Sequence, residues 1–118
     1  MNTSSSLGMQ AERFVAHQLE QQGFIILAQN YKKTYGEIDI IAQQKNLIVF
    51  VEVKMRTTDY FDSAELITYT KQRKIITTAS TFLAEQALED SSCRFDVALV
   101  SKSNNEFSMT YLTDAFQA

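Results

Sequence analysis

The sequence predicts an α/β fold with a mixed central β-sheet flanked by helices, and three observations lead to this class. Helical and strand-like periodicities follow one another in the order helix, three strands, helix, strand, strand. The central strands are apolar on both faces, as strands of a covered sheet are. With 118 residues, 45% of them hydrophobic, the chain has the size of one compact domain, which we expect to span residues 1–118.

The first element is a helix expected from Ser4 to Gln22. Serines offer an N-cap at its start, and Gly23 follows its last turn. Its apolar residues recur at helical spacing and form one stripe, made of Leu7, Ala11, Phe14, Val15 and Leu19. This stripe predicts the face that the helix buries.

Three strands are expected next, over Phe24–Asn30, Glu37 to about Gln43, and Leu47–Lys54. The third is rich in β-branched and aromatic residues and is the strongest strand in the chain. We expect residues 31–36 to form a connecting loop and residues 44–46 to form a hairpin turn. Three strands joined by such short connections predict an antiparallel meander.

The second half begins with residues 57–70, which we expect to form a loop with some helix. A helix capped by Thr70 is then expected to reach about Asp90, followed by strands at Arg94–Ser101 and Phe107–Leu112. The helix can cross over the sheet and lay the strand after it parallel to the third strand. The core is therefore predicted as helix, three-strand meander, helix and strand.

Charged residues stand in two of these apolar strands. Strand alternation places Glu37 and Asp39 on one face, with Ile38 and Ile40 on the other. In the third strand, Glu52 and Lys54 share one face and the intervening valines share the other. Charges in such strands are costly unless they are paired or coordinated.

The two helices add polar groups that point the same way. Glu12 lies within the apolar stripe of the first helix, and Gln72 lies one turn ahead of the buried face of the second. If Glu12, Asp39 and Glu52 converge, their mutual repulsion raises some of their pKa values unless a cation sits among them.

Ligation by oxygen alone suits Mg²⁺ or Mn²⁺, whereas zinc prefers His or Cys. Lys54, two residues after Glu52, would then project beside the metal. From there it could orient an attacking water or stabilise charge on a phosphoryl group.

Each motif alone also has a purely structural interpretation. Acid-x-acid and acid-x-Lys triplets are common on half-exposed strands, and only their succession behind an acid-bearing helix favours a site. Three further residues are expected to be structural. We expect His17 on the surface and the thiol of Cys93 in the core. Asp96 is expected to be an ion-pair partner, although a fourth acid of the site is the alternative.

The Gly36-Glu37-Ile38-Asp39 and Val51-Glu52-Val53-Lys54 boxes, behind a helix that carries Glu12, resemble the PD-(D/E)xK nuclease superfamily. That superfamily includes restriction enzymes and Holliday-junction resolvases. From about Gly8 to Val100 the chain is similar to the YraN family of small bacterial predicted endonucleases. Further matching positions are Asn30, Phe50, Arg56, Lys71 and the segment Arg94-Phe95-Asp96-Val97.

The resemblance implies a restriction-endonuclease-like core and specific roles for residues of this chain. Asp39 and Glu52 would bind Mg²⁺ or Mn²⁺ with Glu12 as an accessory acid, Lys54 would be the catalytic lysine, and Gln72 would support the site. Two departures remove no proposed ligand: Ala11 and Asp62 stand where the family usually has glycine. Resolvase-like relatives work as dimers, which makes a homodimer plausible.

The overall charge limits how nucleic acid can bind. Eleven basic against fourteen acidic residues give a net charge of −3, which is not typical of a protein that coats nucleic acid. Binding would need local clusters of bases and aromatics near the acidic boxes. Such candidates are Lys32, Lys33 and Tyr35 before Asp39, Lys71, Arg73 and Lys74 at the start of the second helix, and Arg56 beyond Lys54. We therefore expect weak, structure-selective binding of DNA.

The leading hypothesis is a hydrolase, a Mg²⁺-dependent endodeoxyribonuclease of DNA repair or recombination that acts on branched or single-strand-containing substrates. One alternative is a catalytically silent module that binds nucleic acid or a partner and keeps the fold. Another is a structural subunit that docks through the last strand and Phe116. The single cysteine, the absence of a signal-like N-terminus and the lack of a long apolar run predict a cytoplasmic protein without membrane association.

Overall fold

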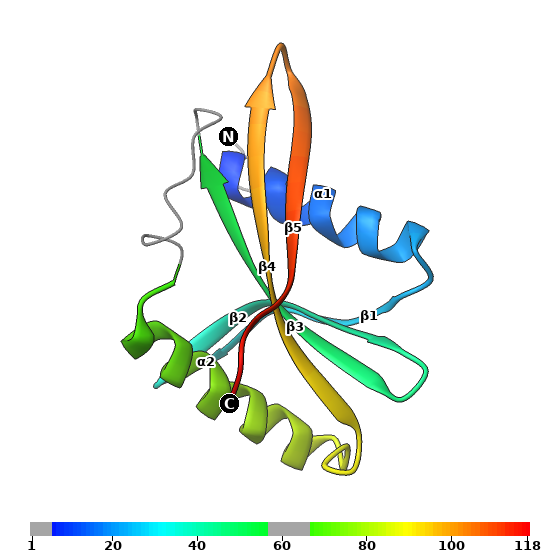
Figure 1. The fold of residues 1–118 in the computed structure, drawn as a ribbon, viewed down its shortest axis with the longest axis vertical. Coiled ribbons are helices and arrows are strands. Elements are labelled where there is room, and N and C mark those ends of the chain that lie inside the picture. Colours follow the sequence, from blue (N-terminus) through cyan, green and yellow to red (C-terminus); the bar gives the residue numbers. More distant parts are fainter. Residues whose placement is uncertain (1–5, 57–66) are drawn as a thin grey trace.

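The computed structural model of the chain describes residues 6–56 and 67–118. Within these ranges, two helices and five strands follow one another in the expected order (Figure 1). Their bounds are α1 Leu7–Gln21, β1 Ile25–Lys33, β2 Gly36–Gln44, β3 Leu47–Arg56, α2 Tyr69–Glu85, β4 Ser92–Ser103 and β5 Glu106–Phe116. Residues 57–66, for which a loop with some helix was expected, lie outside the described residues.

The five strands form one mixed sheet in the order β1-β2-β3-β4-β5. Strands β1, β2 and β3 pair antiparallel, β4 lies parallel to β3, and β5 returns antiparallel to β4. The predicted meander and the crossover through α2 are therefore confirmed.

The helices cover opposite faces of this sheet, and each face has its own core. On one face α1 packs Val15 and Leu19 against Val49 and Val51 of β3. On the other, α2 packs its apolar side, including Phe82, against a second set of strand residues (Figure 1). The sheet is thus covered on both sides, as its apolar central strands predicted.

The boundaries of α2 differ from the prediction. Its N-cap is Thr68, whose side chain accepts a hydrogen bond from the backbone N–H of Lys71, so Thr70 lies inside the helix. The helix ends at Glu85. Ala87 then adopts a φ of 56°, a left-handed conformation that closes many helices, although glycine is the usual residue there. Without a glycine or proline at this point, the sequence does not show where the helix stops.

Strand β1 extends further than predicted. Tyr31, Lys32 and Lys33 belong to β1, and only Thr34 and Tyr35 form the turn to β2. The loop expected over residues 31–36 is therefore wrong, because backbone pairing with β2 continues to the Lys33–Gly36 position.

The first three strands do not stay together along their whole length. The pairing of β2 with β3 runs from Gln44–Leu47 to Ile40–Val51 and stops there. Beyond this point β2 pairs only with β1, and β3 continues beside β4 as far as Arg56. The two strands diverge (Figure 1), and we call this opening the β2–β3 fork, made of residues 36–39 and 52–56.

The alternation of side chains changes at the fork. Ile38 belongs to the core cluster under α2, whereas Ile40 belongs to the cluster under α1. The expectation that both share one face is therefore wrong. Asn30 of β1 stands opposite Asp39, between two paired positions, and has a φ of 53°. This local irregularity breaks the strict period of two at Asp39.

Candidate active site

Asp39 and Glu52 are the first residues on the two sides of the β2–β3 fork. Each follows the last residue pair of the β2–β3 ladder, Ile40 with Val51. The divergence leaves the backbone N–H of Val53 without a strand partner on that side, and it donates to Oδ2 of Asp39 at 2.8 Å. The carboxylate of Asp39 thus holds the two arms of the fork at a fixed separation.

The surroundings of Asp39 disfavour its charged form. Burial is the largest cause and repulsion from Glu52 the second, and together they raise the pKa of Asp39 to about 8 despite the hydrogen bond from Val53. Burial also raises the pKa of half-buried Glu12, against hydrogen bonds with Asn30 and Asp39 that lower it. The carboxyl groups of Glu12, Asp39 and Glu52 are therefore close together, with too little neighbouring positive charge to stabilise all of their charged forms.

Lys71 of α2 supplies part of that positive charge. Its Nζ lies 2.6 Å from Oε2 of Glu52, whose side chain is 8% exposed, while the Lys71 side chain is 52% exposed. Burial lowers the pKa of Lys71, but the hydrogen bond and attraction to Glu52 outweigh it and leave this pKa raised. Lys71 was predicted to bind nucleic acid, and the structure places it as the counter-ion of Glu52.

A cavity of about 410 Å³ opens at the fork and is called here the acidic cavity. Glu37, Asp39 and Glu52 line it from the sheet, and Lys71, Lys74 and Ile75 line it from α2. Gly36 also lines the cavity, and an added Cβ there would lie 2.4 Å from Oγ1 of Thr78. Because glycine has no Cβ, the first residue of β2 can lie directly against α2.

The donors of this cavity suit a hard divalent cation in type, because they are carboxylates that repel one another. Asp39 and Glu52 both line the cavity and repel each other, and their carboxylates are of the donor type that such an ion prefers. Within residues 6–56 and 67–118, however, no three Asp, Glu, His or Cys side chains are grouped as ligands of a single ion. Glu12 reaches the pair through its hydrogen bond with Asp39.

Comparison with known proteins shows the family. The model of the uncharacterised protein family UPF0102 matches residues 11–100. The chain belongs to this family. A UPF0102 protein of Desulforapulum autotrophicum is 41% identical over 98% of this chain and 97% of its own length. The UPF0102 protein of Nitrosomonas europaea is 39% identical over 98% of both chains, and that of Vibrio parahaemolyticus is 43% identical over 85% and 84%.

The family resemblance found in the sequence is thereby confirmed, and residues 11–100 include every residue predicted for the site of this UPF0102 chain. In the described part of the chain, no helix is both long and apolar enough to cross a membrane.

The remaining predicted site residues lie at varying distances from the acidic cavity. Lys54 is half-buried two residues beyond Glu52 and does not line the cavity. Gln72 donates to the backbone carbonyl of Ile67 at 3.1 Å, so its amide secures the start of α2. Arg56, at the end of β3, also lies outside the cavity wall.

A second cavity, of about 690 Å³, adjoins the first and is called here the basic cavity. It lies between the β1–β2 turn and the first turns of α2. The two cavities share Gly36, Glu37, Thr70 and Lys74. Its cationic and aromatic lining consists of Lys32, Lys33, Tyr35, Tyr69, Arg73 and Lys74. The structure thus brings the first predicted cluster together with Arg73 and Lys74 of the second, whereas Lys71 lines the acidic cavity.

Two of these lysines have acidic neighbours. Nζ of Lys33 lies 2.8 Å from Glu85, and that of Lys32 lies 3.9 Å from Glu37. Sequence reasoning did not select Tyr69, which is 72% exposed on the wall of the basic cavity. The sequence signal for Tyr69 is its position four residues before Arg73, because such residues are neighbours on a helix. In the structure the guanidinium of Arg73 lies 6.0 Å from the centre of the Tyr69 ring.

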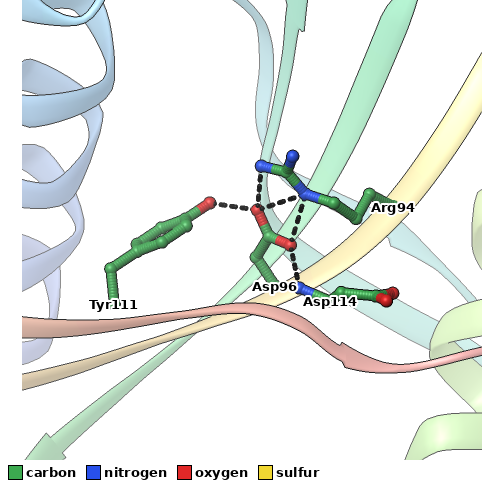
Figure 2. Close-up of polar contacts among 4 residues, drawn as sticks. All are labelled: Arg94, Asp96, Tyr111 and Asp114. Atoms are coloured by element: carbon green, nitrogen blue, oxygen red, sulfur yellow. Dashed lines mark hydrogen bonds and ion pairs between the residues drawn. The ribbon is translucent and has the colours of Figure 1, made fainter.

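Asp96 is an ion-pair partner, as expected, and it is fully buried. Its carboxylate accepts hydrogen bonds from Arg94 at 2.9 Å, from the hydroxyl of Tyr111 at 2.5 Å and from the backbone N–H of Asp114 at 2.8 Å (Figure 2). The β4–β5 register shifts at this position, and Asp114 has a φ of 57°. The hydrogen bonds of Asp96 therefore stabilise the irregular backbone of β5, and Asp96 is not part of the acidic cavity.

Three other expectations were tested. His17 is exposed, as predicted. Cys93 is also exposed, so the expected core thiol is wrong: β4 begins at Ser92, and its first two residues are both exposed. Phe116 is 7% exposed and stacks on Phe95 with ring centres 5.2 Å apart, so it does not offer the docking surface that was considered.

Proposed function

We propose that this UPF0102 protein is a metal-dependent endonuclease that hydrolyses phosphodiester bonds in DNA, with branched or single-strand-containing substrates preferred. The observation that carries the proposal is the pair of carboxylates, Asp39 and Glu52, at the point where β2 and β3 diverge. Their repulsion and the raised pKa of Asp39 are what a cation would relieve. Groups with such perturbed pKa values in a cavity are typical of active sites.

In this proposal Asp39 and Glu52 hold Mg²⁺ or Mn²⁺, which would supply positive charge against the phosphoryl oxygens of the substrate. Glu12 of α1 positions the carboxylate of Asp39 through a hydrogen bond, and Asn30 of β1 is a hydrogen-bond partner of Glu12. The backbone N–H of Val53 fixes the same carboxylate from β3. Three groups from different elements, α1, β1 and β3, thus contribute directly or indirectly to the orientation of one ligand.

Lys54 is proposed as the catalytic lysine. From its place two residues beyond Glu52 its ammonium group would orient the attacking water or stabilise the charge that develops on phosphorus oxygens. The ion pair of Lys71 with Glu52 would break when the cation binds, and the ammonium group of Lys71 would then contact the phosphate. In the net reaction water adds to phosphorus, one P–O ester bond breaks, and a phosphate monoester and a hydroxyl end are formed.

The substrate preference follows from charge. A net charge of −3 does not support many phosphate contacts along a duplex, whereas a few cations beside the acidic cavity suffice for a junction or flap. We further propose a homodimer, which would bring two such sites to one branched substrate.

A second candidate is a catalytically silent module that binds nucleic acid or a partner. The observation that favours it is the 2.6 Å ion pair between Lys71 and Glu52, which already gives Glu52 a counter-ion. The two candidates differ in whether a divalent cation displaces this lysine.

The deciding experiment adds Mg²⁺ or Mn²⁺ to purified protein with labelled duplex, single-stranded, flap and four-way-junction DNA. Asp39→Asn and Lys54→Gln are run beside Lys45→Gln, a matched control at the exposed β2–β3 turn, away from both cavities. Metal-dependent cleavage that Asp39→Asn and Lys54→Gln abolish and Lys45→Gln retains supports the nuclease. The nuclease proposal is rejected in favour of the silent module if no substrate is cut and calorimetry shows no divalent-ion binding that depends on Asp39.

A further inference from the structure

The basic cavity has the composition of a nucleotide-binding pocket, although the acidic cavity beside it carries the proposed chemistry. Its volume of about 690 Å³ falls within the range of roughly 300–1,000 Å³ that is usual for small-molecule sites. Cations and two tyrosines line it. We propose that this cavity binds one unpaired nucleotide of the substrate strand, with its base on the tyrosines and its phosphate on the cations of α2.

The two tyrosines are placed as stacking surfaces. Tyr69 and Tyr35 are 72% and 42% exposed, although large apolar rings on a protein surface are usually better covered. The hydroxyl of Tyr35 lies 2.5 Å from Oγ1 of Thr81, which anchors the ring against α2. The guanidinium of Arg73 supports Tyr69 at 6.0 Å. A base needs such a pre-positioned aromatic face, and one stacked base is worth roughly 1–3 kcal/mol.

The cations that remain available lie on the α2 wall. Lys33 lies against Glu85 at 2.8 Å, and Lys71 against Glu52 at 2.6 Å. Lys74, by contrast, has no ion pair with any residue of the described ranges 6–56 and 67–118. Lys74 lines both cavities, so a phosphate bound there would lie between the tyrosines and the carboxylates.

The charge of the two cavities changes along this path. Glu37 is the one acid among the described residues that line the basic cavity, and its carboxylate has Lys32 at 3.9 Å. The acidic cavity instead has Glu37, Asp39 and Glu52. A strand that passes from one to the other would be attracted by the basic end and cut at the acidic end. The β1–β2 turn and the first turns of α2 line the basic cavity from two sides.

This inference rests on the proposed function for its orientation, since the nucleotide is taken to flank the phosphate that is cut. Its test is independent of cleavage. A single-stranded oligodeoxynucleotide with one 2-aminopurine is titrated with the full chain in EDTA at low salt, and the fluorescence of the probe reports stacking. The fully paired duplex with the same probe is the comparison.

We expect wild-type protein to quench the single-stranded probe and to bind the duplex more weakly. Tyr69→Ala and Tyr35→Ala should each weaken single-strand binding about 5- to 100-fold. Tyr69→Phe should bind as wild type does, because it keeps the ring, and circular dichroism checks that each variant is folded. Lys74→Gln should reduce the slope of log affinity against log salt by about 1, and Lys45→Gln should not change it.

The outcomes separate the two proposals. Binding that is unaffected by Tyr69→Ala and Tyr35→Ala, or equal for duplex and single strand, overturns the nucleotide pocket even if the protein cuts DNA. Tyrosine-dependent quenching supports the pocket even if no substrate is cut, and the failure then belongs to the nuclease proposal alone.

Discussion

Asp96 and Asp39 are two acids of one sheet whose surroundings differ in kind. Asp96 is 0% exposed and accepts hydrogen bonds from Arg94, Tyr111 and the backbone of Asp114 (Figure 2). Asp39 lies at the fork with one backbone donor, and repulsion from Glu52 adds to its burial to raise its pKa to about 8. The protein's own donors satisfy the first carboxylate, whereas the second is left short of positive charge.

The difference explains why burial alone does not identify a functional acid. A buried carboxylate with a full set of partners fixes a structure, here the register shift between β4 and β5. A carboxylate gathered with others of like charge lowers stability, and such an arrangement is typical of a site that receives a cation. Four changes test this comparison, from the largest expected effect to the smallest.

Asp96→Asn should have the largest effect on stability. The change leaves Arg94 without its buried counter-charge and points an amide at existing donors, so we expect a loss of about 3–5 kcal/mol in the free energy of unfolding. Urea unfolding followed by circular dichroism measures it. Glu89→Gln, at an exposed acid, is the control, and a loss below about 1 kcal/mol for Asp96→Asn would mean that the network is not structural.

Gly36→Ala should be the next largest, because the two cavities meet at this glycine. The new Cβ would lie 2.4 Å from Oγ1 of Thr78, which is buried, and 3.0 Å from the carbonyl of Lys74. We expect a loss of about 1–3 kcal/mol from this overpacking. Gly8→Ala meets nothing within 4 Å and should be neutral or stabilising. Equal effects at both glycines would show that β2 does not need this close approach to α2.

Asp39→Asn should stabilise the metal-free protein at high pH. The pKa of Asp39 is raised from 3.8 to about 8 on folding, so the folded state holds a proton that the unfolded state has released. The stability that this proton contributes is present at acidic pH and is lost as the pH rises towards about 8.

Thermal unfolding in EDTA at pH 5 and pH 8 measures the effect. From pH 5 to pH 8, the free energy of unfolding of wild type should fall by at least about 1.4 kcal/mol more than that of Asp39→Asn. This difference is the equivalent of one pKa unit. Identical pH profiles would contradict the raised pKa.

Lys71→Gln should have the smallest effect on stability. The lysine side chain is 52% exposed, and partly solvated ion pairs contribute less than about 1 kcal/mol. Its effect should appear in function instead, because Glu52 loses its counter-ion and should bind Mn²⁺ more readily in calorimetry. Weaker Mn²⁺ binding than wild type would show that Lys71 does not compete for Glu52.

The fold was largely predictable from sequence, because it follows from local patterns. The valines of β3 alternate as in a strand, and the apolar residues of α1 recur at helical spacing. The order of the elements then predicts that the chain crosses over through α2 to place β4 parallel to β3. The end of α2 was not predictable, since Ala87 takes a conformation that glycine usually marks.

The residues of the candidate site can be proposed from the sequence, whereas their geometry cannot. Asp39, Glu52 and Lys54 stand out as charges in apolar strands. The fork depends on where two strands stop pairing, and the change of face between Ile38 and Ile40 breaks the alternation on which the prediction relied. The ion pair of Lys71 with Glu52 joins residues 19 positions apart, which no local pattern reveals.

The most direct test of the central claim is the cleavage activity of Asp39→Asn. If Asp39 is kept for a cation, this variant is folded, at least as stable as wild type at pH 8, and cleaves the preferred DNA substrate in Mn²⁺ at least about 100-fold more slowly. A folded Asp39→Asn that cuts the substrate at the wild-type rate would contradict the account.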